Sequence, residues 1–116
     1  MNKPSDPAGS EAEQLAALRA LQGSPAASQR ELASTLGLSL GKTNFLIRAL
    51  LEKGQMKVES FRRSDRKLGY LYVLTPSGAL EKARLTRVFL RRKELEYARL
   101  QEEIAGLRSE VEQSNP

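Results

Sequence analysis

The chain has 116 residues and a net charge of +5, and it contains neither cysteine nor histidine. The missing cysteines exclude a disulfide framework and a thiolate metal site, and the missing histidines remove the commonest metal ligand and general base. A catalytic base would have to be a carboxylate, and the acidic residues fall on exposed helical positions. We therefore predict a protein that is not an enzyme and that needs no cofactor and no metal.

The pI near 9.8 is compatible with a polyanionic partner. No apolar run is long enough to span a bilayer, and the N-terminus has no signal-peptide core. We therefore expect a cytoplasmic protein, associated with the nucleoid if bacterial, that is built as one domain with an extension.

The N-terminal part of the chain predicts a tail and a first helix. Residues 1–10 are rich in Pro, Ser and Gly, which is typical of a disordered segment. Ser10 and Glu13 have the spacing of a capping box, in which each side chain bonds the backbone N–H of the other residue. The helix that follows is expected to bury Leu15, Leu18 and Leu21 and to end at the Gly-Ser-Pro sequence of residues 23–25.

The stretch 28–54 predicts two short helices joined by a tight turn. Ser28 and Ser39 are candidate N-caps, and Gly37 and Gly54 are placed to end the two helices. The first helix would turn Leu32, Ala33 and Leu36 inward. A short turn that contains Gly between two such helices is typical of a helix-turn-helix.

The second of these helices has an outer face suited to DNA. Its apolar spacing turns four residues inward, namely Thr43, Leu46, Ile47 and Leu50. The candidate DNA contacts at its start and on its outer face are Ser39, Lys42, Asn44, Phe45 and Arg48. A groove-reading face needs polar groups for base edges, which we assign to Asn44 and Arg48, an apolar contact for a thymine methyl, and cations for phosphate. The alternative is an ordinary amphipathic helix with one exposed Phe.

Residues 56–61 and 70–74 predict two paired strands. The sequence between them, RRSDRKLG, is basic and too long for a two-residue turn. Its candidate DNA contacts are Arg62, Arg63, Asp65, Arg66 and Lys67. Three helices followed by a hairpin with a charged tip have the order of a winged helix-turn-helix, which we predict for residues 11–75. The alternative for the basic segment is a solvated loop that aids solubility.

Residues 76–113 predict one long helix, because Pro76 suits a first turn and Ala, Leu, Glu, Arg and Lys dominate the rest. Its distal half carries a heptad repeat with Lys93 at one core position. The apolar core positions are Leu90, Tyr97, Leu100, Ile104, Leu107 and Val111. We predict that they form a coiled-coil dimer interface, and the alternative is a helix folded back on its own domain. A parallel pair would place Glu103 near Arg108 of the partner subunit, whereas an antiparallel pair would bring Glu near Glu.

These features together resemble the MarR family of bacterial transcriptional regulators over roughly residues 11–111. The matching segments are LASTLGLSLGKTNFLIRALLEKG at 32–54, Ser-Asp-Arg at 64–66, and Leu-Thr-Pro-Ser-Gly at 74–78, which is similar to the family's Leu-Thr-x-x-Gly. With EKARLTRVFLRRKELEYARLQEEIAGL at 81–107, the chain is most similar to the subgroup associated with exopolysaccharide gene clusters.

The resemblance implies a homodimer that binds double-stranded DNA at an inverted repeat and regulates transcription, with exopolysaccharide genes as candidate targets. By similarity, the wing would reach a minor groove, where Arg66 would insert and Asp65 would orient it. Family members build the dimer from helices at both ends, with an effector pocket beside them. Here the first helix is short and the C-terminal part is a single helix, so a small-molecule effector is not part of the prediction.

The predicted fold is mainly α with a small β-hairpin (α+β): a winged helix-turn-helix followed by a long C-terminal dimerisation helix. The predicted function is sequence-specific, double-stranded DNA binding by a homodimeric transcriptional regulator. The alternative function is a winged-helix and coiled-coil adaptor for protein interactions, which would be expected to lack the polar and basic density of the recognition helix or the wing.

Overall fold

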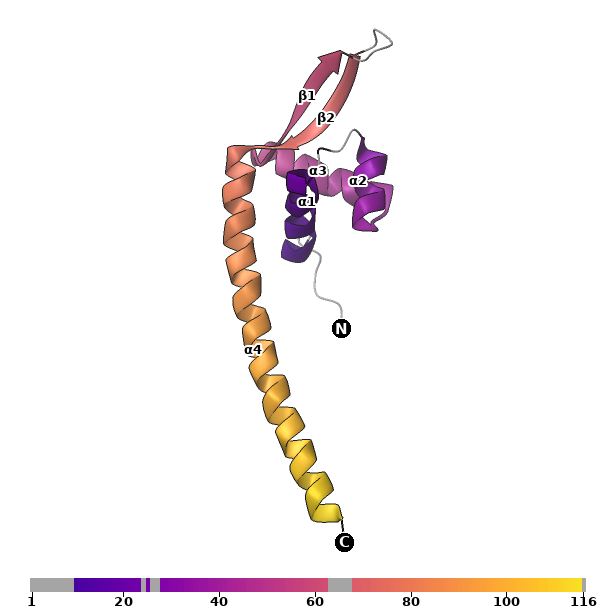
Figure 1. Ribbon diagram of the computed structural model, residues 1–116. Helices are drawn as coiled ribbons and strands as arrows, with labels where there is room; N and C mark the ends of the chain where they lie inside the picture. Colours follow the sequence, from indigo (N-terminus) through magenta and orange to yellow (C-terminus); the bar gives the residue numbers. More distant parts are fainter. Residues whose placement is uncertain (1–9, 24, 26–27, 63–67, 116) are drawn as a thin grey trace. The chain divides into compact units, whose positions relative to one another are not determined.

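The computed structural model describes residues 10–23, 25, 28–62 and 68–115, and of these it does not describe the side chains of 61, 62, 68 and 69. The elements are α1 (Glu11–Gly23), α2 (Gln29–Leu36), α3 (Leu40–Glu52), β1 (Met56–Arg62), β2 (Leu68–Leu74) and α4 (Pro76–Ser114) (Figure 1). This order confirms the predicted mainly helical fold, with its winged helix-turn-helix and long C-terminal helix. The predicted disordered tail, apart from Ser10, lies outside the described residues.

The chain divides into two compact units within α4, the first ending at Leu85 and the second beginning at Thr86. The first unit therefore contains the winged helix-turn-helix and the start of α4, and the second contains the remainder of that helix. None of the helices in the described ranges is long and apolar enough to cross a membrane.

The predicted capping box begins α1. The Ser10 backbone N–H donates to Glu13 Oε1 at 3.1 Å, and the Ser10 hydroxyl accepts from the Glu13 backbone N–H at the same distance. Two backbone N–H groups that an isolated helix start would leave unpaired are thereby satisfied.

The helix-turn-helix is held by caps at both ends of its turn. The Ser28 hydroxyl accepts from the Glu31 backbone N–H at 3.0 Å, and the Ser39 hydroxyl accepts from the Lys42 backbone N–H at 3.1 Å. Gly37 ends α2 in the left-handed conformation, with φ +68°. Backbone bonds from residues 37 and 38 to the carbonyls of 34 and 33 complete a Schellman motif. All the predicted caps of this segment are confirmed.

The core joins the three short helices to the base of the hairpin and the start of α4. Apolar residues of α1 pack with α2, α3 and β2, and α3 also packs on α2 and β1. The fully buried large side chains are Leu18, Leu32, Leu46, Leu50, Met56, Leu85 and Thr43. The predicted stripe on α1 and the predicted inward face of α3 are both confirmed.

The hairpin is antiparallel, with its register running from Met56 opposite Leu74 to Arg62 opposite Leu68. Both strands extend slightly further toward the tip than predicted. Only the base of β1 enters the core: Met56 is 2% exposed, whereas Val58, on the same face of the strand, is 46% exposed. The hairpin is therefore anchored at its base and exposed along β1 beyond that point, as a wing must be to reach a ligand.

The segment that resembles Leu-Thr-x-x-Gly connects β2, α4 and the turn after α3. The Thr75 hydroxyl donates to the Gly54 carbonyl at 2.6 Å and accepts from the Gly78 backbone N–H at 3.0 Å. The Thr75 backbone N–H donates to the Gln55 carbonyl at 3.2 Å. Gly78 packs so closely that a Cβ there would lie 2.1 Å from the same carbonyl oxygen. Thr75 thus caps α4 and ties it to the end of α3, and Gly78 permits the close approach.

We predict that Gly78→Ala lowers the free energy of unfolding by about 1–3 kcal/mol, because the added methyl group must displace backbone. Gly41→Ala makes the same chemical change inside α3, where nothing lies within 4 Å of the new Cβ. This control should leave stability unchanged or raise it by up to about 1 kcal/mol. Urea denaturation of both variants is the measurement, and equal stabilities would contradict the proposed close contact.

Candidate nucleic-acid interface

α3 separates into a buried face and an exposed face. Thr43, Leu46, Ile47 and Leu50 are each at most 2% exposed. The five predicted contacts at the start and on the outer face of the helix, Ser39, Lys42, Asn44, Phe45 and Arg48, are all exposed. Within the helix, residues three and four apart are neighbours on the surface, so Lys42, Phe45 and Arg48 follow one another and Asn44 lies beside Arg48. The structure thus brings the predicted recognition residues together on one surface.

An amide side chain positions the start of this helix. Gln29, at the beginning of α2, donates through Nε2 to the backbone carbonyl of Leu40 at 3.0 Å. Leu40 is the first residue of α3. Sequence patterns do not reveal this contact, since the two residues are distant in sequence and belong to no local capping motif. This bond links the start of α2 to the start of α3, in addition to the apolar packing between the two helices.

Ser39 is predicted both as the N-cap of α3 and as a DNA contact, and its capping role is confirmed. Its hydroxyl oxygen already accepts a hydrogen bond from the Lys42 backbone N–H. The hydroxyl hydrogen remains able to donate, because Ser supplies one donor besides its acceptor lone pairs. Capping α3 and donating to an anion beside the helix start are therefore compatible roles for Ser39.

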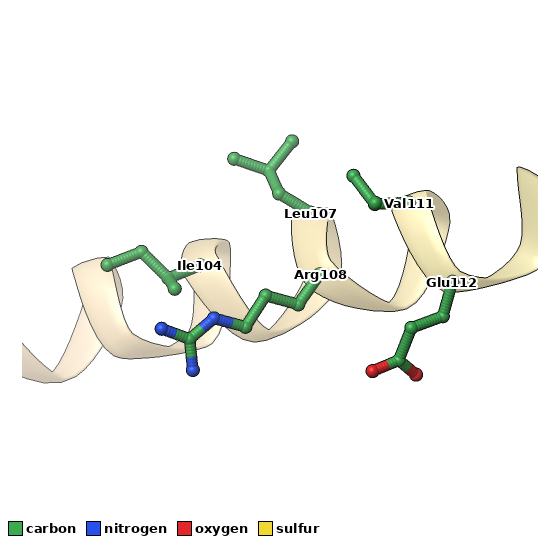
Figure 2. A pocket seen from close by; sticks show the side chains of 5 residues that line it. All are labelled: Ile104, Leu107, Arg108, Val111 and Glu112. Carbon is green, nitrogen blue, oxygen red and sulfur yellow. The ribbon is translucent and has the colours of Figure 1, made fainter. Parts of the chain in front are cut away.

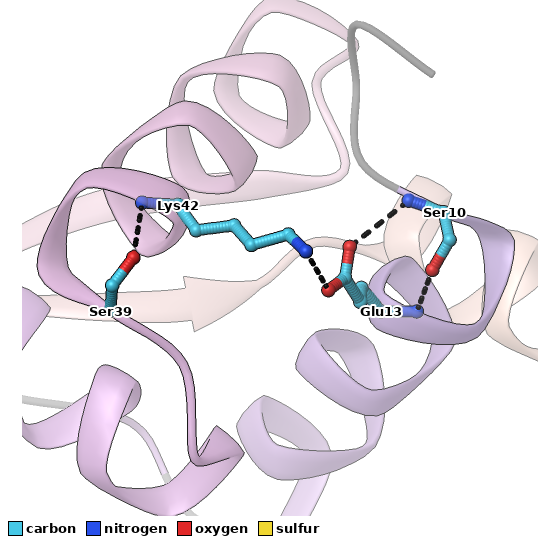
Figure 3. A network of polar contacts seen from close by, with 4 residues as sticks. All are labelled: Ser10, Glu13, Ser39 and Lys42. Atoms are coloured by element: carbon cyan, nitrogen blue, oxygen red, sulfur yellow. Dashed lines mark hydrogen bonds and ion pairs between the residues drawn. The ribbon is translucent and has the colours of Figure 1, made fainter. Parts of the chain in front are cut away.

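Lys42 forms an ion pair that the sequence analysis missed. Its Nζ lies 2.9 Å from Glu13 Oε2, with 56% of the Lys42 side chain and 20% of the Glu13 side chain exposed. Figure 3 shows the Lys42 side chain extending from α3 to the first turn of α1, where Ser10 bonds the same carboxylate. The hydrogen bond from Lys42, aided by the one from the Ser10 backbone, lowers the pKa of Glu13 below its ordinary value. Glu13 is therefore ionised at neutral pH and links α1 to α3.

The wing is described only in part. Arg62 ends β1, but its side chain is outside the described residues, as are Arg63, Asp65, Arg66 and Lys67. On the described part of the hairpin, Lys57 and Glu59 form an exposed ion pair at 3.1 Å. DNA contact by the basic wing residues stays a prediction.

The distal part of α4 presents the predicted heptad positions as an exposed apolar stripe. Leu90, Tyr97, Leu100, Ile104, Leu107 and Val111 are between 46% and 64% exposed. Figure 2 shows three of them beside Arg108 and Glu112, where the five side chains line an open groove of about 300 Å³. At the polar core position, the Lys93 ammonium lies 3.2 Å from Glu96 Oε2.

Residues 14–55 match a family model described as winged helix-turn-helix DNA-binding. The match begins in α1, includes all of α2 and α3, and ends just before β1. A sequence search of curated proteins gives no significant match.

Solved structures of transcriptional regulators share the fold. The transcriptional repressor CouR, solved bound to a 23-mer DNA duplex, is 24% identical with a TM-score of 0.61, and the match covers 92% of this chain and 75% of CouR. The PcaV regulator from Streptomyces coelicolor is 22% identical with a TM-score of 0.59, covering 87% and 79% of the two chains. A MarR family transcription regulator is 15% identical with a TM-score of 0.58, covering 89% and 74%. At these identities the likeness establishes the shared fold.

The Glu13–Lys42 pair predicts a specific pH dependence of stability. Because the pKa of folded Glu13 is lowered, its contribution is present above the ordinary value of 4.5 and is lost as the pH falls through the lowered value. Glu13→Gln should therefore be less stable than the parent at pH 7, by about 0.2–1 kcal/mol for so exposed a pair. The difference should shrink as the pH falls below 4.5 and vanish once the pH lies below the lowered pKa of Glu13.

Chemical denaturation of both proteins between pH 3 and pH 7 measures this difference. Glu81, whose pKa is lowered by the hydrogen bond from Arg84, is common to both proteins, so its contribution cancels. Glu52→Gln is a matched control on the last turn of α3, where Glu52 has no ion pair among the described residues. A Glu13→Gln curve that stays parallel to the parent's at all pH values would contradict the prediction.

Proposed function

We propose that this protein is a transcriptional regulator that binds double-stranded DNA in a sequence-specific manner, with α3 as its recognition helix. The observation that carries the proposal is the division of α3 into a fully buried face and an exposed face bearing Lys, Asn, Phe and Arg. The match of residues 14–55 to a DNA-binding winged helix-turn-helix model supports it, as does the fold shared with a repressor solved on DNA.

The side chains of the exposed face have distinct tasks in this proposal. Asn44 is suited to bidentate hydrogen bonding with adenine, and Arg48 with guanine. Phe45, which is 53% exposed, supplies an apolar surface for a thymine methyl group. Ser39 and Lys42 lie at the N-terminal end of α3, where the helix dipole also favours a phosphate.

The wing extends this proposal to a second groove. The basic residues of the wing are Arg62, which ends β1, and Arg63, Arg66 and Lys67, which follow it in the sequence before β2. The base of β1 is anchored in the core by Met56. A narrow minor groove has an enhanced negative potential that attracts Arg, and the family resemblance assigns insertion to Arg66 and its orientation to Asp65. Because most of these contacts would be to phosphate, the wing would contribute affinity for all sequences.

The resemblance to the exopolysaccharide-associated subgroup also supports a proposal for the regulated genes. A chain of this kind would control genes for exopolysaccharide synthesis from an inverted repeat in their promoter. Nuclease protection of such a promoter by the purified protein is the direct test.

We predict that Arg48→Ala costs about 1–3 kcal/mol of affinity for a specific site and relaxes the preference at one base pair. Sites are first selected by the parent protein from a pool of random duplexes, and affinities are then measured at fixed salt. Arg19→Ala, an exposed Arg on α1, is the control and should leave the selected site's affinity nearly unchanged. If Arg48→Ala bound selected and random DNA as tightly as the parent, the assignment of the recognition face would be wrong. A parent that selects no sequence would favour the adaptor function instead.

The proposal includes a homodimer joined through the distal part of α4. The apolar stripe from Leu90 to Val111 repeats at heptad spacing and is exposed in the single chain. A second copy of the same helix would bury it, with the groove in Figure 2 receiving side chains of the partner subunit. The Lys93 ammonium, paired with Glu96 at the edge of the stripe, would not have to enter the seam unpaired. Two recognition helices could then read inverted half-sites about 34–36 Å apart along the duplex.

Changing both Leu100 and Ile104 to Lys should place charges in the seam and separate the subunits, while the winged helix keeps its own core. Sedimentation should then detect monomers, and affinity for a full site should fall toward that of a half-site. The control, Ala98→Lys with Ala105→Lys, adds the same charge at exposed positions off the seam and should remain dimeric. A dimeric Leu100/Ile104 variant, or a monomeric one with undiminished affinity for the full site, would refute this use of the helix.

A further inference from the structure

Lys42 is committed to an intramolecular partner although it lies on the proposed DNA-binding surface. Its backbone is fixed in the first turn of α3 by the Ser39 hydroxyl. Its side chain crosses to α1, where Nζ lies 2.9 Å from Glu13 Oε2 (Figure 3). The ammonium that would neutralise a phosphate at the start of the recognition helix is therefore already paired with a carboxylate.

Hydrogen bonding to Ser10 holds the Glu13 carboxylate at the first turn of α1. Its Oε1 accepts from the Ser10 backbone N–H at 3.1 Å, and its own backbone N–H donates to the Ser10 hydroxyl. One carboxylate thus divides its oxygens between capping α1 and binding Lys42. A phosphate that recruits Lys42 must break the ion pair, because the carboxylate stays with α1.

We propose that Glu13 competes with DNA phosphate for the Lys42 ammonium and thereby lowers the affinity of the recognition helix for DNA of arbitrary sequence. This inference rests on the proposed function, since it assigns a regulatory role to a residue beside the proposed recognition surface. Glu13 itself does not need to touch DNA for this role.

The physical consequence concerns non-specific binding. Binding to arbitrary DNA is driven by phosphate neutralisation, and each neutralised phosphate adds about 0.9 to the slope of log affinity against log salt. Withholding one cation removes one such contact from every sequence. The base-edge groups Asn44 and Arg48 are not part of the Glu13 network, so a larger share of the remaining affinity depends on sequence.

Glu13→Gln tests the proposal, because the amide oxygen of Gln can still accept from the Ser10 backbone N–H while the charge that holds Lys42 is removed. The probe is a labelled random-sequence duplex of about 24 base pairs, roughly two helical turns. Fluorescence anisotropy between about 50 and 200 mM salt should show an affinity gain of about two- to fivefold, the factor that corresponds to an exposed ion pair. The salt slope should become steeper by about 0.9.

Two further variants separate release of Lys42 from the loss of a negative charge. Lys42→Ala should abolish the gain in the Glu13→Gln background, and it should weaken binding less in the parent background than in the Glu13→Gln background. Glu13→Asp keeps the charge but shortens the side chain by one methylene, so it should also raise affinity, without any change in net charge. Glu52→Gln, at the end of α3, changes the net charge of the protein by the same amount as Glu13→Gln on α1 and should leave affinity for the random duplex near the parent's. Thermal denaturation of each variant identifies the proteins that are folded, and Glu13→Asp serves as the test if Glu13→Gln is not.

The outcomes distinguish this inference from the proposed function. A parent that binds DNA, with Glu13→Gln and Glu13→Asp both at the parent's affinity, would overturn the competition and leave the proposed function standing. An equal gain from Glu13→Gln with and without Lys42 would also overturn it, since the effect would then be general electrostatics. Failure of the parent and every variant to bind any duplex would refute the proposed function, and the inference with it.

Discussion

Burial of one face of α3 determines what its other face presents. Thr43, Leu46, Ile47 and Leu50 are each at most 2% exposed and pack in the centre of the winged-helix core. Successive residues are about 100° apart around a helix, so a rotation of α3 by one residue would bring Asn44 into the core and expose Thr43. The energetic cost of burying Asn unpaired and exposing apolar side chains holds the helix in one rotation. The exposed residues therefore keep fixed positions relative to one another, as a surface that reads base edges requires.

Hydrogen bonds hold both ends of α3, in addition to the packing of its buried face. Ser39 caps its start, and Gln29 bonds the Leu40 carbonyl from α2. Gly54 ends it at φ +71°, and the carbonyls of Gly54 and Gln55 accept from Thr75. Since Thr75 also caps α4, the turn that ends α3 is bonded directly to the start of the long helix.

Features that depend on neighbouring residues could be predicted from the sequence. The caps at Ser10, Ser28 and Ser39, the Gly37 terminator and the buried face of α3 all follow from local spacing, and each is confirmed. The Gln29–Leu40 bond and the Glu13–Lys42 pair join residues that no periodic pattern connects, and the sequence analysis missed both. A capping box accounts for a Glu at position 13 by itself, so the sequence predicts no second partner for Glu13. The proposed DNA contacts depend on a ligand outside the chain. Contact of the exposed face of α3 and of the wing with DNA therefore stays a prediction.

The stability of the distal part of α4 gives an independent physical reason for a partner. The compact unit that begins at Thr86 contains this one helix, and from Leu90 to Val111 every residue is exposed. Helices in proteins owe most of their stability to packing of an amphipathic face, and isolated helices are marginal in water even when their sequences favour them. Local ion pairs such as Lys93 with Glu96 contribute only a few tenths of a kcal/mol each. By contrast, fully burying one apolar side chain contributes about 1.5–3 kcal/mol. Burying the six half-exposed residues in heptad register would therefore stabilise the helix far more than its surface ion pairs do. A second copy of the helix carries the same apolar spacing and so can pack against this stripe. The proposed homodimer would stabilise the helix and bring two recognition surfaces to one duplex.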